Sequence, residues 1–127
     1  MRFRSYLHSG VLRWGPAVLI MGIIFLLSSI PSEAMPVYGR YDWPVKKLGH
    51  LTGYALLSYS ILRGLGRKDL PAIALAWFLT VLFGASDELH QAFVPGRQST
   101  LIDVGIDAVG AFLGLLPSLY HRSRKPR

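Results

Sequence analysis

The sequence predicts an all-α fold: a four-transmembrane-helix bundle with both termini in the cytoplasm, formed by a single membrane domain spanning residues 1–127. Three observations support it. Apolar residues make up 51% of the 127 residues, and the mean hydropathy is +0.36. Long apolar segments alternate with turn-forming stretches, and Lys and Arg gather on one side of the resulting topology. A soluble domain of this size rarely combines so many apolar residues with apolar segments of this length, so we expect the protein to lie in a bilayer.

Each apolar segment approaches the roughly 20 residues that an α-helix needs to cross the hydrocarbon core of a bilayer. We expect helices near residues 14–30, 48–65, 70–90 and 101–120. Proline and glycine in the intervening stretches are typical of turns, and Pro31 ends the first helix. Glycines four residues apart, Gly49/Gly53 and Gly110/Gly114, predict close contacts between helix backbones in lipid.

The orientation follows from the basic residues, because Lys and Arg in short loops stay on the cytoplasmic side. One side of the predicted topology holds Arg2, Arg4, Arg13, Arg63, Arg67, Lys68, Arg122, Arg124, Lys125 and Arg127. The other side holds only Arg40, Lys46, Lys47 and Arg97. The net charge of +7 therefore reflects membrane topology, and without a nucleic-acid motif we expect no nucleic-acid partner.

The first segment has an alternative reading as a signal peptide. A basic start, an apolar stretch and the small-x-small sequence Ser32-Glu33-Ala34 would fit cleavage before Met35. We favour a retained helix, because its removal would leave three crossings and place the basic tail on the wrong side of the membrane.

Polar side chains concentrate at the outer end of the predicted bundle. They are Lys47, His50 and Tyr54 on the second helix, Asp87, Glu88, His90 and Gln91 on the third, Arg97 in the next loop, and Asp103 and Asp107 on the fourth. Residues three, four and seven apart share a helix face, so the members from the second helix and those from the fourth each lie on one face. Because all lie at a similar membrane depth, we expect them to converge.

Burying this many ionisable groups near lipid is costly. Insertion scales give about 2.5–3.5 kcal/mol for an aspartate at mid-bilayer, and Asp107 lies only about 9 Å below Leu101 along the helix. Such side chains should face the bundle interior or a water-filled recess, paired with the nearby cations. Ionisable groups in a membrane indicate a functional site, although a purely structural hydrogen-bond network is the alternative reading.

The residues divide into two sets by the chemistry they offer. If the protein is an enzyme, the catalytic candidates for general acid–base chemistry are Asp87, Glu88, His90 and Asp103. The candidate ligand-binding residues are Lys47, His50, Tyr54, Gln91, Arg97 and Asp107. We predict no cofactor and no metal, because no HExxH or comparable ligand spacing occurs and cysteine is absent.

Two motifs of the chain resemble the signature of VanZ-like membrane proteins. They are Lys47-x-x-His50-x-x-x-Tyr54, and the run from Ser86 to Arg97 (SDELHQAFVPGR) followed by Asp103 and Asp107-x-x-Gly110-x-x-x-Gly114. The likeness covers about residues 14–118. Two positions depart from the family pattern: Lys46 stands where an aspartate often precedes the lysine, and Asp107 where asparagine is frequent.

The resemblance implies a multi-pass protein of the bacterial cytoplasmic (inner) membrane with a role in the cell envelope. The family takes its name from a protein associated with resistance to teicoplanin, a glycopeptide antibiotic. We therefore expect an outward-facing site that binds a lipid headgroup or lipid-linked wall precursor and modulates envelope properties such as glycopeptide susceptibility. A membrane enzyme acting on a lipid-linked substrate is the alternative. A proton-linked carrier or small channel is disfavoured, because almost no ionisable residue lies in the inner half of the bundle. Membrane lipids are the expected partners, and the sequence is compatible with a monomer or a homo-oligomer.

Overall fold

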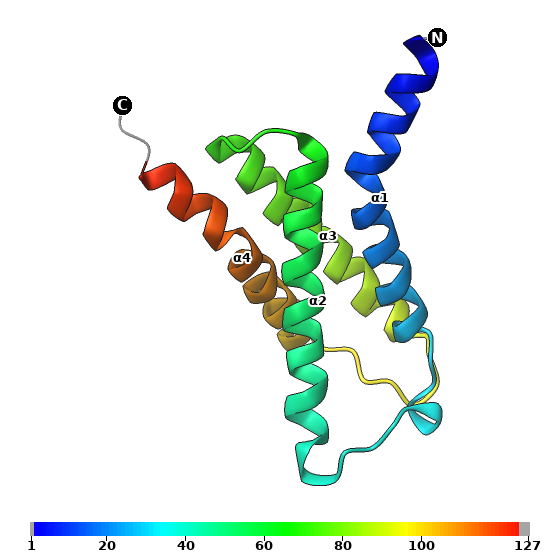
Figure 1. Cartoon of the computed structure of the whole chain (residues 1–127). Coiled ribbons are helices and arrows are strands. Elements are labelled where there is room, and N and C mark those ends of the chain that lie inside the picture. The colour runs from blue at the N-terminus through cyan, green and yellow to red at the C-terminus, as the bar shows by residue number, and fades with distance from the viewer. Residues whose placement is uncertain (1, 125–127) are drawn as a thin grey trace.

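The protein is all-helical. A computed structural model describes the backbone of residues 2–124 and the side chains of residues 9–124. Its elements are α1 (Arg2–Ser28), the short 3-10 helices η1 (Ser32–Ala34) and η2 (Gly39–Tyr41), α2 (Asp42–Leu65), α3 (Leu70–Gln91) and α4 (Leu101–Ser123) (Figure 1). No strand occurs within the described residues, which confirms the predicted all-α class.

The helices lie where the sequence predicts them, but two begin earlier. α1 starts at Arg2 rather than near residue 14, and α2 starts at Asp42 rather than near residue 48. Apolar windows mark only the part of a helix that needs lipid, whereas its polar ends continue into the interface. Pro44 lies in the first turn of α2, where its missing N–H removes no helical hydrogen bond. The helix can therefore begin before this proline, in a stretch that we expected to be a loop.

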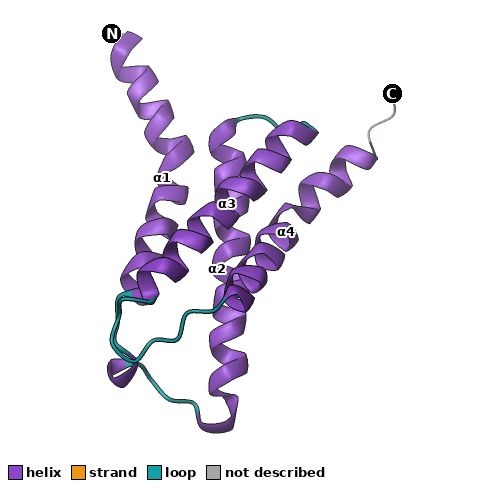
Figure 2. Cartoon of the chain, turned by 180° about the vertical axis from the view of Figure 1, so that it is seen from behind, coloured by secondary structure: helices purple, strands orange, loops and turns teal. Residues whose placement is uncertain are grey.

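The four long helices alternate in direction, so the two ends of the molecule differ (Figures 1 and 2). The start of α1, the end of α4 and the short α2–α3 turn lie at one end, and the two longer connections, residues 29–41 and 92–100, lie at the other. These connections are joined by a hydrogen bond from the Ser32 N–H to the Pro95 carbonyl at 3.2 Å. α2 is central and packs against the other three long helices. We call the end with the long connections the loop end.

Three of the described helices are long and apolar enough to cross a membrane: Ser9–Ser28 of α1, α3 and α4. α2 is not among them, and its sequence includes Lys46, Lys47 and Arg63 as well as polar serines and tyrosines. A fourth crossing by α2 and cytoplasmic termini therefore stay predictions. The side chains of Arg2 and Arg4, and all of residues 125–127, lie outside the described part of the chain.

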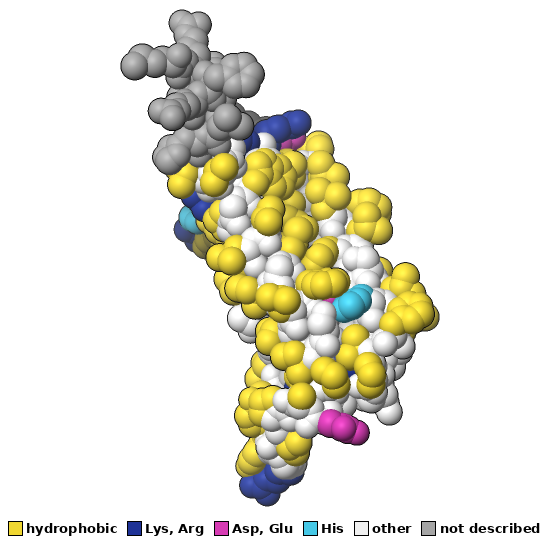
Figure 3. All heavy atoms as spheres, turned by 90° about the vertical axis from the view of Figure 1, so that its right-hand side faces the viewer, with side chains coloured by type: hydrophobic (Ala, Val, Ile, Leu, Met, Phe, Trp, Pro, Cys, Tyr) yellow, Lys and Arg dark blue, Asp and Glu magenta, His cyan; other side chains and the backbone are white. Residues whose placement is uncertain are grey.

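The outer surface of the bundle is apolar. Large hydrophobic side chains are well exposed along α1, α3 and α4, including Leu26, Phe78 and Val109. Figure 3 shows one such face, on which hydrophobic side chains cover the middle and Lys and Arg lie toward the ends. Such a surface would favour aggregation in water, and a bilayer accommodates it.

Small residues bring α4 against α2. A Cβ atom on Gly110 would lie 2.7 Å from the Leu51 carbonyl oxygen, and one on Gly114 would lie 2.6 Å from the Ser58 hydroxyl. The predicted Gly110/Gly114 contact is therefore present. The expected close contact at Gly49 of the Gly49/Gly53 pair is not present, because a Cβ atom on Gly49 would have no neighbouring atom within 4 Å.

Candidate functional site

A cavity of about 620 Å³ opens at the loop end of the bundle, between α1, α2, α3, the first turn of α4 and the two long connections. Eight of the ten polar residues singled out in the sequence line it: Lys47, His50, Tyr54, Asp87, Glu88, Gln91, Arg97 and Asp103. Asp107 is fully buried and contacts the lining residue His50. His90 is not part of the lining.

Asp87 accepts hydrogen bonds from three helices. Its Oδ2 receives the Ser28 hydroxyl at 2.7 Å, the Gln91 amide at 3.0 Å and the Tyr54 hydroxyl at 3.3 Å. The Gln91 amide also donates to Ser28 Oγ at 3.1 Å. Asp87 Oδ1 is buried and has no partner among the described residues, so the donors converge on one oxygen only. This arrangement fixes the carboxyl group while leaving half of its acceptor capacity unused.

Lys47 and Asp103, which both line the cavity, form an ion pair between α2 and α4. Asp103 is held in place locally as well. The Thr100 hydroxyl donates to Asp103 Oδ2 at 2.8 Å and accepts from the Asp103 N–H at 3.2 Å, so Thr100 caps the start of α4. The pair neutralises one cation and one anion of the site and ties the two helices together.

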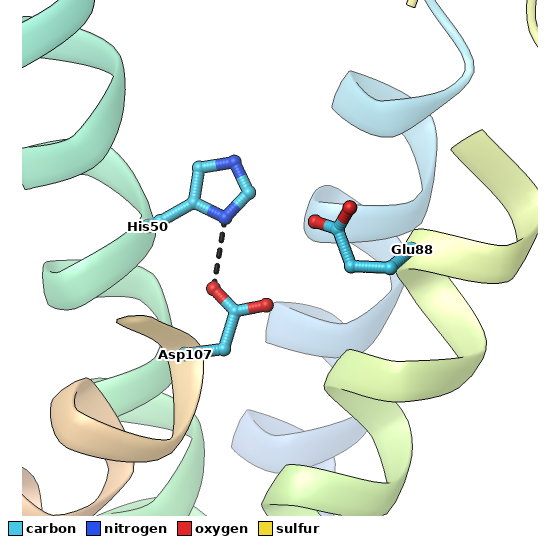
Figure 4. A group of neighbouring side chains, drawn as sticks. All are labelled: His50, Glu88 and Asp107. Carbon is cyan, nitrogen blue, oxygen red and sulfur yellow. Dashed lines mark hydrogen bonds and ion pairs between the residues drawn. The ribbon is translucent and has the colours of Figure 1, made fainter. Parts of the chain in front are cut away.

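His50, Glu88 and Asp107 form a second polar group, one residue from each of α2, α3 and α4 (Figure 4). His50 Nδ1 lies 2.9 Å from Asp107 Oδ1, and Figure 4 shows the Glu88 carboxylate pointing toward the same space. Gly84 makes this packing feasible, because a Cβ there would lie 3.1 Å from the Tyr54 ring and 3.3 Å from Asp107. Both Glu88 carboxylate oxygens and Asp107 Oδ2 are buried without a partner among the described residues.

Arg97 reaches into the cavity from the α3–α4 connection. Its guanidinium contacts the Met35 sulfur, a weak acceptor, and its Nε–H is buried without a partner among the described residues. Gly96, at φ +72°, supplies the turn that aims the arginine, and a Cβ there would lie 3.0 Å from Ser32. Arg97 thus carries one buried donor, the Nε–H, that the described residues do not satisfy.

His90 lies against α1 instead of the cavity. Its imidazole stacks on Phe25 with ring centroids 4.4 Å apart, and its Nε2 lies 2.9 Å from the Ser29 hydroxyl. Four of the last five residues of α3 are polar, and their side chains point in different directions around the helix axis. Their order in the sequence therefore does not show which side chains face the bundle interior. Asp87, Glu88 and Gln91 line the cavity, whereas His90 packs against Phe25 of α1.

α1 contributes residues that the sequence analysis missed. Ser28 and Ser29 bond to Asp87 and to His90, so all four long helices take part in the polar network. The sequence offered one indication of their role, because these two serines lie at the end of an apolar segment that carries no charge. Met35 and Gln98, which also line the cavity, carried no comparable signal.

A sequence model of the VanZ/LLP1 family matches residues 13–120. The chain belongs to this family. The VanZ/LLP1 match includes every residue that lines the cavity and all four long helices in large part. Searches among curated proteins and among solved structures returned no match. Family membership and the apolar helices together identify a VanZ-like membrane protein.

Proposed function

We propose that this VanZ-like protein binds the phosphate-bearing headgroup of an envelope lipid or lipid-linked wall precursor in the cavity at its loop end, and so modulates the cell envelope. The observation that carries the proposal is Arg97, a partly buried guanidinium whose Nε–H has no partner among the described residues and whose terminal nitrogen meets only a thioether sulfur. A guanidinium binds phosphate or carboxylate oxygens through paired charge-assisted hydrogen bonds.

The charges around Arg97 define the kind of headgroup that would fit. Lys46 and Lys47 line the same cavity but are paired with Asp42 and Asp103, so Arg97 is the lining cation that offers an anionic phosphate an unsatisfied donor. Asp87 and Glu88 lie on another wall and offer buried oxygens as acceptors. A ligand that combines phosphate with hydroxyl, amide or ammonium donors would satisfy both sets, and lipid headgroups and wall precursors have this composition.

The apolar part of such a ligand would also find a suitable surface. Ile24 and Leu27 of α1 line the cavity beside the polar groups, and neighbouring residues of α1 are exposed. A lipid tail could therefore lie against α1 in the bilayer while its headgroup enters the cavity. The proposal places the loop end at the outer face of a bacterial cytoplasmic membrane, as the distribution of basic residues favours.

The test is binding of a soluble short-chain polyprenyl pyrophosphate to the protein in nanodiscs of neutral lipid. Arg97→Gln should weaken binding by roughly 10–150-fold, the equivalent of about 1.5–3 kcal/mol for hydrogen bonds to a charged group. Arg40→Gln is the matched control, because Arg40 lies at the same end on η2 and does not line the cavity. Equal binding by wild type and Arg97→Gln would contradict the proposal.

A cellular experiment addresses the envelope role. Overexpression in a glycopeptide-sensitive bacterium should change teicoplanin susceptibility, and Arg97→Gln should remove the change while Arg40→Gln preserves it. Unchanged susceptibility, combined with intact headgroup binding in nanodiscs, would confine the proposal to binding and reject the glycopeptide part.

A membrane enzyme is the second candidate, favoured by one observation. The buried Asp107 holds the imidazole of His50 through Nδ1 at 2.9 Å, which is how a carboxylate orients a histidine that acts as a general base. In this hypothesis, His50→Gln would abolish turnover of a lipid-linked substrate without abolishing its binding. The absence of any turnover by protein that binds the substrate would reject it.

A further inference from the structure

His50, Glu88 and Asp107 offer one imidazole nitrogen and two carboxylates from three different helices (Figure 4). One ligand atom from each can be chosen so that all of them lie within 4.8 Å of one another. The closest pair, His50 Nδ1 and Asp107 Oδ1, is separated by 2.9 Å. Two ligands of one ion, each about 2.0–2.2 Å from it, stand roughly 3.0–3.5 Å apart, so this pair already has nearly the required spacing.

The burial of these groups is an independent indication of a ligand. Glu88 is 3% exposed and Asp107 is fully buried. Three of their four carboxylate oxygens have no hydrogen-bond partner among the described residues. A buried carboxylate is stable only if a proton, a hydrogen-bond donor or a cation compensates its charge. Lys47, a cation that lines the same cavity, is already paired with Asp103.

We propose that His50, Glu88 and Asp107 form a binding site for a divalent first-row metal ion of the Zn²⁺ class. The site would differ from the headgroup interactions of Arg97, and it stands whether or not the cavity binds a lipid. It also departs from the sequence-based prediction of no metal.

The donor set decides the class of ion. Imidazole nitrogen suits Zn²⁺ and related transition metals, whereas Ca²⁺ and Mg²⁺ prefer oxygen ligands alone. Three protein ligands leave a coordination position open, and His50 and Glu88 both border the cavity, so that position would face a bound molecule. The Glu88 carboxylate already points toward the His50–Asp107 pair (Figure 4). The ion would then link α2, α3 and α4.

The experiment uses the full chain in detergent micelles, with any affinity tag removed and bound metal stripped by a chelator. Zn²⁺ is titrated calorimetrically, and Co²⁺ serves as a spectroscopic probe whose visible absorption reports nitrogen and oxygen ligands. Wild type should bind either ion with defined stoichiometry. Glu88→Gln and His50→Ala should each weaken Zn²⁺ binding by at least about tenfold, the lower end of what even an outer-shell partner contributes to metal affinity.

Thermal unfolding supplies a readout that does not depend on any activity. Glu88→Gln keeps the shape of the side chain and removes a buried unpaired charge, so without metal the variant should be at least as stable as wild type. Added Zn²⁺ should raise the unfolding temperature of wild type, because a ligand bound only by the folded state stabilises it, and should have little effect on Glu88→Gln.

Glu33→Gln is the matched control. Glu33 lies on η1 at the same end of the molecule, is exposed, and belongs to neither the cavity lining nor the group of three. It should bind Zn²⁺ like wild type. The proposal is overturned if wild type binds no Zn²⁺ above background, or if Glu88→Gln and Glu33→Gln bind it equally.

Discussion

Replacing Gly114 by alanine should destabilise the bundle, because the added methyl group would enter the contact between α4 and α2. The ideal Cβ position lies 2.6 Å from Ser58 Oγ and even closer to the Ala55 carbonyl oxygen. Ser58 cannot simply turn away, since it is fully buried and its hydroxyl donates to the Ala111 carbonyl at 2.8 Å. Separating two helix backbones is the remaining response, and overpacking of this kind costs about 1–3 kcal/mol.

Gly105→Ala is the matched control on the same helix. A Cβ at Gly105 meets nothing within 4 Å, so this variant carries only the higher helix propensity of alanine, worth about 0.8–1 kcal/mol in its favour. Both variants gain this helix propensity, so the difference between their free energies of unfolding measures the effect of the α2–α4 contact alone. We expect Gly114→Ala to be less stable than Gly105→Ala by about 1–3 kcal/mol. The free energy of unfolding in mixed SDS micelles measures this, and equal values would refute the proposed α2–α4 packing.

Two further predictions concern ion pairs. Lys47→Ala should destabilise the protein by about 1–3 kcal/mol, between the values for exposed and buried pairs, because the two side chains are 22% and 11% exposed. The Lys47→Ala/Asp103→Ala double variant should lose less than the sum of the single losses, and additivity in the same SDS assay would contradict the pair. In the α2–α3 turn, the hydrogen-bonded Arg67 guanidinium lowers the pKa of Asp69, so the pair stabilises the fold above the usual carboxyl range and the effect is lost as pH falls through the lowered pKa. By NMR, Asp69 should titrate at higher pH in Arg67→Gln than in wild type, and unchanged titration would argue against the contact.

The sequence predicted the class and the approximate helix positions because apolar runs long enough for a bilayer are a strong signal. It placed the starts of α1 and α2 too late, because charged residues such as Arg13 in α1 and Lys46 and Lys47 in α2 interrupt the apolar sequence near these ends. The Gly110/Gly114 contact was also predictable from spacing. The apparently similar Gly49 is not in a close contact, since spacing says nothing about which face of α2 meets another helix.

The candidate site was predictable as a region, but its internal pairing was not. Shared depth placed the polar residues at one end, and most of them line one cavity. Which side chains meet depends on helix rotation and on contacts between distant segments. His50, Glu88 and Asp107 come from three helices, so no local motif could reveal their proximity. The same limitation explains why His90 was grouped with the cavity and why Ser28 was overlooked.

An envelope-facing site requires the cavity to open to the outside of the membrane, and single-cysteine labelling measures this directly. The natural chain has no cysteine, so each introduced thiol is unique. In intact cells, a membrane-impermeant maleimide should label Gln98→Cys, at the cavity, and should label Lys68→Cys, in the α2–α3 turn, only after permeabilisation. The reverse pattern would place the cavity in the cytoplasm and contradict an envelope-facing site.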